Sequence, residues 1–448
     1  MNKLTRILLA CTAFLSPIHP LLAQEKTEKI NAYVGIHVVP MDRERLIENQ
    51  TVIVKDGKIT EIGDADKVKV PLNAVVIPSK GLFMMPGLTD MHAHLPSFPE
   101  GEGEINIHDY LLLNVMRGVT SIRGMRGDPE QLAWRDSIAR HQLLGPRLFL
   151  ASPVLPGQDN LNARKAGELL DKYKREGYDF VKYLYPLRSS CYDSVMKLAD
   201  EKGVKVAGHC PEGGLESAIR HKQASVEHLD GFLEAYKKDT MHFHDLMRQM
   251  ATAGLFACPD YQWYYVYWNQ LSLPQMRMKE GVNILPPKVV NAWAASFDKS
   301  NAERTKDKVA WLKKKDAHRI ELEQAMKMLK GMSDDGVPLL ISAGDGAFIV
   351  PGYSVMDECR NFTDAGISIY ETLKAATVNA ASFFGESGSW GTLRPGMRAD
   401  MLILEENPLL NIENLNTIKG VVLNGTWLSR EELDRMGQEM KDRNQVSK

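Results

Sequence analysis

The stretch Pro86-Gly87-Leu88-Thr89-Asp90-Met91-His92-Ala93-His94 decides the fold, because it joins a strand pattern to two potential metal ligands. An apolar run at residues 82–85 precedes it, which is typical of a strand that emerges from a buried sheet. Alternate residues of a strand share a face, so His92 and His94 are expected to point the same way. Two imidazoles on one strand can form half of a metal site, although an isolated His-x-His pair is more often structural.

Alternating strand and helix patterns follow this stretch and predict a parallel α/β array. Eight strand candidates can be counted, at residues 88–94, 119–125, 147–152, 180–185, 204–210, 225–230, 255–261 and 339–345. Eight β/α units is the number in a closed barrel, whose active site lies at the carboxyl ends of the strands. We therefore expect an α/β fold with a (β/α)8 TIM-type barrel over residues 86–388.

Short β patterns lie at both ends of the chain, over residues 24–85 and 389–448. Turn residues such as Asp56-Gly57 and Gly63-Asp64 separate the strands of the first segment. Two β-rich ends that enclose a long middle predict one small β-sandwich built from both chain ends, followed by a C-terminal tail.

The connection over residues 262–337 is longer than a barrel needs for one loop and one helix. It opens with an aromatic cluster, formed by Trp263, Tyr264, Tyr265, Tyr267 and Trp268. Long connections inside compact domains are usually functional or disordered. Aromatic side chains at the active-site end favour a lid or a substrate wall over simple packing.

Residues 1–23 have the layout of a signal peptide. Lys3 and Arg6 precede a short apolar run, and the segment ends at Leu21-Leu22-Ala23. The run is too short to span a bilayer, so we expect cleavage after Ala23, export to the periplasm or secretion, and no integral membrane segment afterwards. Anchoring as a lipoprotein through Cys11 is the less favoured alternative.

Composition excludes several classes of protein and site. The formal net charge is −2, without the basic excess that nucleic acids or anionic membranes require, so neither is an expected partner. The cysteines of the mature chain contain no CxxC pair, which argues against a zinc knuckle and a dense disulfide framework. An oxidising compartment would allow one disulfide to form among Cys191, Cys210, Cys258 and Cys359, and buried free thiols are the favoured alternative.

Four further candidate ligands stand near the ends of separate predicted strands, and they are Lys182, His209, His228 and Asp345. Each alone could complete a hydrogen-bond network or begin a loop. Together with His92 and His94, they place six polar groups at one mouth of the predicted barrel. Polar groups gathered at such a mouth usually form a site, so the sequence predicts a metal centre there.

Several motifs resemble those of the amidohydrolase superfamily, in its imidazolonepropionase-like and prolidase-like branch of metal-dependent hydrolases. Besides the opening stretch, they are Gly118-Val119-Thr120-Ser121-Ile122-Arg123, Phe180-Val181-Lys182, Gly208-His209-Cys210-Pro211, Ser225-Val226-Glu227-His228-Leu229, Ala375-Ala376-Thr377-Val378-Asn379-Ala380-Ala381 and Gly391-Thr392-Leu393-Arg394-Pro395-Gly396-Met397-Arg398-Ala399-Asp400. The resemblance covers essentially the whole mature chain. Together these motifs are specific, although none is so by itself.

The resemblance implies a site for two divalent metal ions. The first ion would be held by His92, His94 and Asp345, and the second by His209 and His228. A carbamate formed from CO2 on Lys182 would bridge the ions, because an ammonium group beside two cations is disfavoured and loses its proton. Asp345 would act as general base and then as general acid. Zinc is the leading candidate, and manganese, cobalt and iron suit the same ligands.

The resemblance favours a small-molecule amide or dipeptide as substrate and a dipeptidase-like or prolidase-like activity. A dipeptide carboxylate needs a cationic partner, for which Arg123 and Arg126 are candidates near strand ends. Aromatic candidates for the wall of the substrate site are Tyr183, Tyr185, Tyr261 and Tyr264. Each of these residues, taken singly, is as readily an exposed arginine or a core tyrosine.

Two other functions stay open at this point. One is a cyclic-amide hydrolase or deaminase with a mononuclear metal site, which metal stoichiometry would distinguish from the binuclear enzyme. The other is a catalytically silent binding or scaffolding protein, against which the complete set of candidate ligands argues. The resemblance also implies a homo-oligomer.

Overall fold

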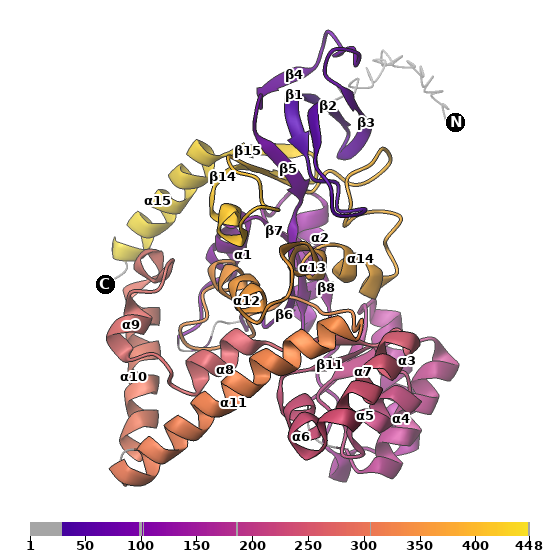
Figure 1. Ribbon diagram of the computed structural model, residues 1–448, viewed down its shortest axis with the longest axis vertical. Helices are drawn as coiled ribbons and strands as arrows, with labels where there is room; N and C mark the ends of the chain where they lie inside the picture. Colours follow the sequence, from indigo (N-terminus) through magenta and orange to yellow (C-terminus); the bar gives the residue numbers. More distant parts are fainter. Residues whose placement is uncertain (1–28, 98–100, 102, 185–186, 305, 447–448) are drawn as a thin grey trace, which may run out of the picture.

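The computed structural model describes residues 29–97, 101, 103–184, 187–304 and 306–446 (Figure 1). The predicted signal peptide and Tyr185 lie outside the described residues. Within this part of the chain, no helix is both long and apolar enough to cross a bilayer. Its four cysteines are free thiols, and two of them, Cys258 and Cys359, are buried.

Strands from both ends of the chain form one mixed sheet. Its order is β15-β14-β13-β5-β1-β2-β3, with β4 paired to β1. The strands span Ile30–Val38 (β1), Ile47–Lys55 (β2), Lys58–Asp64 (β3), Val75–Pro78 (β4), Phe83–Pro86 (β5), Met401–Leu404 (β13), Ile418–Leu423 (β14) and Thr426–Ser429 (β15). Both ends therefore build one β unit, as expected, but their pairing joins all of these strands into one continuous sheet.

This terminal sheet positions the strand that carries His92. The β2–β3 hairpin turns at Asp56-Gly57, whose φ angles of 49° and 78° suit a two-residue turn with positive φ at both positions. Strand β13 runs antiparallel to β5, with Met401 opposite Pro86 and Leu404 opposite Phe83. Because β5 continues almost directly into the next strand, the C-terminal segment holds the start of the central array in place.

Seven parallel strands form that central array. Strands β6 (Leu88–Ala93), β7 (Val119–Gly124) and β8 (Arg147–Leu150) make one sheet, and β9 (Val181–Tyr183), β10 (Val206–Gly208), β11 (Ser225–Glu227) and β12 (Phe256–Cys258) make another. Single bridges from Ala151 to Phe180 and from Ala257 to Leu339 extend the second sheet at both edges. Strands β6 and β7 are buried throughout, as expected for parallel strands covered on both faces.

The eighth predicted strand, residues 339–345, is not a regular strand in the structure. Leu339 makes an isolated bridge, and Met91 N donates to Ile341 O at 2.9 Å. Beyond that point Gly344 adopts a φ of 74°, a left-handed conformation that ends an extended run. Asp345 therefore lies on a loop and not on a strand.

Helices alternate with the parallel strands. They span Ile107–Met116 (α1), Pro129–Ala139 (α2), Ala163–Glu176 (α3), Ser189–Lys202 (α4), Gly214–Arg220 (α5), Asp230–Lys238 (α6), Thr240–Ala253 (α7), Tyr353–Asp364 (α12), Ile369–Ala375 (α13), Val378–Phe384 (α14) and Arg430–Val446 (α15). Local sequence sets their ends, as in α3. Its cap Asn162 accepts a hydrogen bond from Lys165 N, and Gly177 closes it with a φ of 85°.

The predicted insertion folds into four helices. They are α8 (Tyr261–Tyr267), α9 (Leu273–Arg277), α10 (Pro287–Arg304) and α11 (Lys308–Asp334). Helix α11 runs diagonally across the lower part of Figure 1, and α9 and α10 lie along its left side. The aromatic cluster largely forms α8, whose first turn is held by the buried Glu358 of α12. Its carboxylate accepts hydrogen bonds from Tyr261 N at 2.9 Å and Gln262 N at 2.7 Å. These two hydrogen bonds satisfy backbone N–H groups at the start of α8 and hold the helix beside the strand ends.

Candidate metal centre

The six predicted ligands come from separate segments and meet at the carboxyl ends of the parallel strands. His92 lies in β6 and His94 follows it, Lys182 is the middle residue of β9, and His209 and His228 directly follow β10 and β11. Asp345 reaches the same place from its loop. Parallel strands that end at one edge bring such residues together although they are far apart in sequence.

Short distances link all six side chains. Lys182 Nζ lies 3.1 Å from His92 Nε2, and His94 Nδ1 lies 3.0 Å from Asp345 Oδ2. The ring centroids are separated by 5.5 Å for His92 and His94, and by 4.6 Å for both His92 and His228 and His209 and His228. The structure therefore places the whole predicted set in one cluster.

Burial keeps the imidazoles of His92, His209 and His228 in their neutral forms. It lowers the pKa of His209 to about 3 and the pKa of His228 to about 4, and it holds the pKa of His92 well below its ordinary value. Burial also lowers the pKa of Lys182 to about 8. Neutral imidazole is the form that binds a metal, so the cluster needs little deprotonation at neutral pH to act as a ligand set.

Three ring nitrogens of the cluster are buried and make no hydrogen bond within the described residues. They are Nε2 of His94, Nε2 of His209 and Nδ1 of His228, the last of which lies within ion-pair distance of Asp260. A buried nitrogen without a partner is unfavourable. An imidazole lone pair that faces other imidazoles, an amine and a carboxylate suits a divalent ion, so these residues fit a metal centre.

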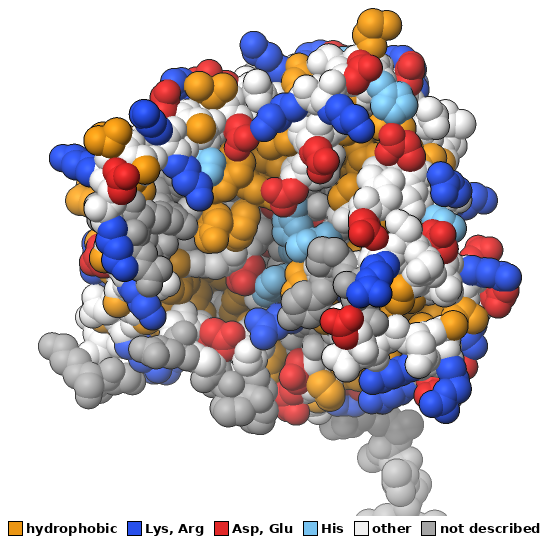
Figure 2. Space-filling view, turned by 90° about the horizontal axis from the view of Figure 1, so that it is seen from below, with side chains coloured by type: hydrophobic (Ala, Val, Ile, Leu, Met, Phe, Trp, Pro, Cys, Tyr) orange, Lys and Arg blue, Asp and Glu red, His pale blue; other side chains and the backbone are white. Residues whose placement is uncertain are grey.

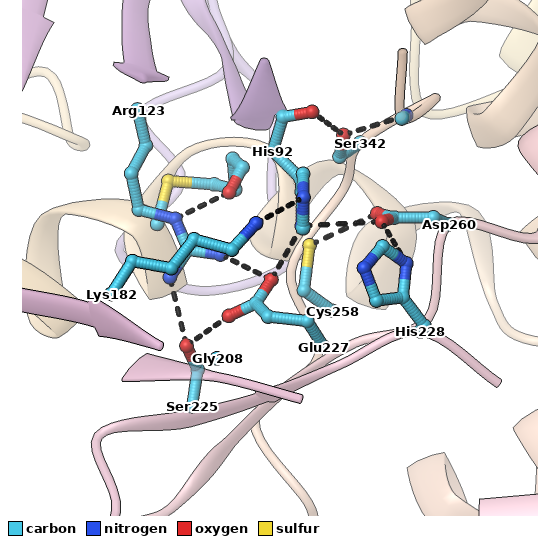
Figure 3. A network of polar contacts seen from close by, with 12 residues as sticks. His92, Arg123, Lys182, Gly208, Ser225, Glu227, His228, Cys258, Asp260 and Ser342 are labelled. Carbon is cyan, nitrogen blue, oxygen red and sulfur yellow. Dashed lines mark hydrogen bonds and ion pairs between the residues drawn. The ribbon is translucent and has the colours of Figure 1, made fainter. Parts of the chain in front are cut away.

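Two buried carboxylates that the sequence analysis did not single out lie behind the histidines (Figure 3). Glu227 Oε2 is 2.8 Å from His92 Nδ1, and Asp260 Oδ2 is 3.2 Å from His92 Nδ1 and 3.0 Å from His228 Nδ1. A carboxylate at Nδ1 fixes the tautomer and leaves Nε2 for a metal. Both residues stand at strand ends, Glu227 at the end of β11 and Asp260 two residues after β12, so the rule that found the other ligands could have found them.

Arg123 lies beneath the histidine cluster, away from the cleft. Its side chain has no exposed surface; Nη2 donates to Glu227 Oε2 at 2.8 Å and Nη1 to Ser225 Oγ at 2.8 Å, and Nε contacts Met91 O. A guanidinium with these buried partners is not accessible to a substrate carboxylate. The predicted substrate contact is therefore replaced by a structural one, in which Arg123 neutralises Glu227.

Of the four predicted tyrosines, the three that the structure describes also lie in the protein interior. The Tyr183 hydroxyl donates to Gln223 Oε1 at 2.9 Å and contacts His209 O, and the Tyr264 hydroxyl donates to Asp230 Oδ2 at 2.6 Å. Tyr261 is buried as well. These side chains support the ligand-bearing segments from behind and do not line the cleft.

A cleft with a volume of about 540 Å³ opens beside His94 and Asp345. Arg126, a candidate for substrate binding, lines this cleft, and Lys299 of α10 lines it too. Figure 2 shows a hollow on this side of the molecule with histidine side chains at its centre. The insertion thus contributes one wall of the cleft, in the place expected for a substrate wall.

Comparison with known proteins identifies the family. The model of the Amidohydrolase family matches residues 83–428. The chain belongs to the amidohydrolase family. As such it is a hydrolase of carbon–nitrogen bonds. This amidohydrolase is 25% identical to an ochratoxinase of Aspergillus niger over 427 residues, a match that covers 87% of this chain and 84% of the relative.

Solved structures share the fold of this amidohydrolase. A putative prolidase of Bifidobacterium longum has a TM-score of 0.68 at 19% identity, with 92% of this chain and 99% of that chain covered. A bottromycin amidohydrolase has a TM-score of 0.69 at 21% identity, with 93% and 90% covered. The amidohydrolase fold therefore spans nearly all of the described chain.

Proposed function

We propose that this amidohydrolase is a binuclear, metal-dependent amide hydrolase of the dipeptidase or prolidase type. The observation that carries the proposal is the position of Lys182, whose buried Nζ faces the buried His92 Nε2 at 3.1 Å within a cluster of four histidines. A buried ammonium group is unfavourable there, whereas a lysine converted to a carbamate becomes an anionic, bidentate ligand. Lys182 lies among the ligands predicted for both metal ions, which is the position that a ligand shared by the two ions requires.

In this proposal His92, His94 and Asp345 would hold the first ion, and His209 and His228 would hold the second. A carbamate on Lys182 would serve both ions as a shared ligand. Zinc is the leading metal, and manganese, cobalt and iron suit the same nitrogen and oxygen donors. Glu227 orients the His92 imidazole through a hydrogen bond at Nδ1. Asp260 lies within ion-pair distance of Nδ1 of both His92 and His228.

The divalent ions, when bound, lower the pKa of the attacking water and polarise the scissile carbonyl. Asp345 moves the proton. Its side chain is about half exposed, at 47%, and Oδ2 lies 3.0 Å from His94 Nδ1, so the carboxylate borders the cleft. It accepts a proton from the water as the water attacks the carbonyl carbon, and it returns that proton to the amine nitrogen as the C–N bond breaks.

We also propose that the central strands close into a (β/α)8 barrel. The bridges at Ala151–Phe180 and Ala257–Leu339 and the hydrogen bond from Met91 N to Ile341 O support a continuous ring. Residues 24–85 and 389–448 would then form the β unit beside the barrel. From the sequence alone, we further propose cleavage after Ala23, export to the periplasm or secretion, and assembly as a homo-oligomer.

The decisive experiment measures amine release and metal content on the same preparation. Mature protein reconstituted with zinc or manganese is offered a dipeptide library with added N-acyl amino acids and cyclic amides. We expect two ions per chain and turnover of dipeptides or N-acyl amino acids. One ion per chain with turnover of cyclic amides or amino-substituted rings would replace the proposal by the mononuclear hydrolase or deaminase.

The pKa of Lys182 makes carbamate formation in the metal-free protein dependent on pH. Only the neutral amine adds CO2, and with the Lys182 pKa at about 8 about a tenth of the amine is neutral at pH 7 and about nine-tenths at pH 9. At constant dissolved CO2, we therefore expect the carbamate to increase as pH rises through 8. The measurement is ¹³C NMR of protein equilibrated with ¹³CO2.

The Lys182→Met variant is the matched control, because methionine fills a similar volume without the amine. The lysine-specific carbamate signal should be missing from it at every pH. Equal signals in the two proteins, or no change in the wild-type signal between pH 7 and pH 9, would contradict the assignment of Lys182 as the carbamate.

A further inference from the structure

A second cavity, of about 120 Å³, adjoins the cleft next to Asp345. We call it the side pocket. Its wall is mainly apolar, formed by Trp263, Val266, Met276, Phe297 and Phe348, and Tyr267 and Asn269 also line it. It meets the cleft at Ser296, Gly346, Ala347 and Ile349, which line both cavities. Gly346 directly follows Asp345, so the entrance to the side pocket begins one residue from the proposed proton donor.

We propose that the side pocket binds the apolar side chain of the amino acid that leaves as the free amine, while the α-carboxylate of that amino acid faces Arg126 and Lys299. The substrate class is then an N-acyl or N-aminoacyl amino acid with a branched or aromatic side chain at its carboxyl end. This inference rests on the proposed function, because it assigns the two sides of the amide bond that the metal centre cleaves.

Trp263 connects the side pocket to the metal centre. Its ring centroid lies 6.2 Å from that of His228, and on its other side it stacks on Tyr267 at 4.5 Å with an interplanar angle of 12°. Its position on α8 is fixed, because Glu358 holds the first turn of that helix. A preformed aromatic wall binds an apolar side chain without the entropic cost of ordering a loop.

Phe348, on the loop that follows Asp345, also supports a binding role for the side pocket. It is fully buried, packs edge-on against Trp293 at 5.6 Å, and adopts a φ of 63°. A positive φ is unfavourable for a bulky residue and, where it persists, tends to occur at functional sites. Here it turns the loop so that the small residues Gly346 and Ala347 stand at the entrance to the side pocket.

The volume of the side pocket fits one medium-sized side chain. A dry, apolar cavity of about 150 Å³ is large enough to bind benzene, so about 120 Å³ suits a leucine, methionine or phenylalanine side chain that projects in from the cleft. The volume is too small for a side chain that carries two rings. The apolar lining also offers little to a charged side chain, whose burial there is unfavourable.

The cleft outside the side pocket supplies the positive charge. Arg126 and Lys299 line the cleft with His94 and Asp345, and no carboxylate of the described residues forms an ion pair with either cation. Glu104 also lines the cleft, but its carboxylate accepts hydrogen bonds from Ser97 Oγ and Gly101 N. A substrate carboxylate is thus attracted to the arginine and lysine.

The order of these features along the cleft assigns the side pocket to the amine side of the scissile bond. Asp345 must reach the leaving nitrogen to protonate it, and the next residue, Gly346, stands at the entrance. The α-carbon bonded to that nitrogen is therefore the nearest branch point, and its side chain enters the side pocket. Its carboxylate remains in the cleft with the cations.

The first test compares N-acetyl-phenylalanine, N-acetyl-leucine, N-acetyl-aspartate and N-acetyl-glycine as substrates of the metal-loaded enzyme. We expect kcat/KM for the phenylalanine and leucine derivatives to exceed that for the glycine derivative by about 10–100-fold, because an apolar side chain is buried. We expect the aspartate derivative to rank with glycine or below it. Values within about threefold across the series would overturn the proposal.

The Ala347→Leu variant tests the entrance itself. A leucine there narrows the opening, so kcat/KM should fall more for N-acetyl-phenylalanine than for N-acetyl-glycine, by about tenfold or more in the ratio. The control is Ala317→Leu, the same substitution at an exposed position of α11, which should leave the ratio unchanged. An equal fall for both substrates in Ala347→Leu would contradict a role in selectivity.

Equilibrium binding separates this inference from the proposed reaction. Free phenylalanine, leucine and glycine are titrated against the wild-type protein, followed by intrinsic tryptophan fluorescence, with Trp263→Phe as the control for the origin of the signal. Binding at least tenfold tighter for phenylalanine and leucine than for glycine supports the side pocket even if no amide is hydrolysed, in which case only the proposed function fails. Equal or undetectable binding of all three overturns the side pocket.

Discussion

Replacing Asp345 with asparagine should lower kcat by about 10²–10⁴-fold, because the amide cannot take a proton from the attacking water or return it to the leaving amine. The position of Asp345 makes this the largest expected effect on activity. Its Oδ2 lies 3.0 Å from His94 Nδ1, and the side chain borders both the cleft and the entrance to the side pocket. The measurement is amine release at saturating substrate, with metal content determined by mass spectrometry on the same sample.

Asp307→Asn is the matched control for this substitution. Asp307 is exposed and caps α11 by accepting a hydrogen bond from Ala310 N, and asparagine caps a helix about equally well. Its kcat should equal that of the wild type. If Asp345→Asn kept full metal content and a kcat within tenfold of the wild type, another residue would have to carry the proton.

Replacing Arg123 with leucine should lower the free energy of unfolding by about 3–5 kcal/mol, because it leaves the buried Glu227 carboxylate without its cation. The Arg123 and Glu227 side chains have no exposed surface, and the pair is joined at 2.8 Å. The guanidinium also packs over the Phe383 ring at 4.7 Å, a contact that leucine can partly keep. The measurement is urea denaturation followed by circular dichroism.

A second variant distinguishes loss of charge pairing from loss of packing. Arg123→Leu combined with Glu227→Gln removes both charges, so it should recover a large part of the lost stability. Arg319→Leu is the surface control. It breaks exposed ion pairs with Asp316 and Glu323 and should cost less than about 1 kcal/mol. A cost below about 1 kcal/mol for Arg123→Leu would show that Glu227 does not need the arginine.

The candidate ligands could be located from the sequence because two local rules determine them. Period-two alternation places His92 and His94 together, and parallel strands present their carboxyl ends at one edge. Lys182, His209 and His228 follow the same rules, and the structure brings all of them within a few ångströms of one another. The prediction of a regular strand over residues 339–345 was wrong, yet Asp345 still reaches the cluster from its loop.

The direction in which a side chain points from its strand could not be predicted from the sequence in the same way. Arg123 stands near the end of β7 and was expected to face substrate, but its side chain turns inward to Glu227 and Ser225. The reason is electrostatic, since the buried Glu227 carboxylate beside His92 requires a buried cation. Whether such a carboxylate exists depends on β11 and β12, which lie far from Arg123 in sequence.

The sequence by itself determined the family-typical order of strands and helices and the types and approximate places of the candidate ligands, because these depend on local periodicity and spacing. Only the tertiary structure decided which carboxylates lie behind the histidines, where Arg123 points and how the side pocket is enclosed. The walls of that pocket come from residues 263–297 and 346–349, and their contact depends on packing between distant segments, for which no local pattern in the chain provides a signal.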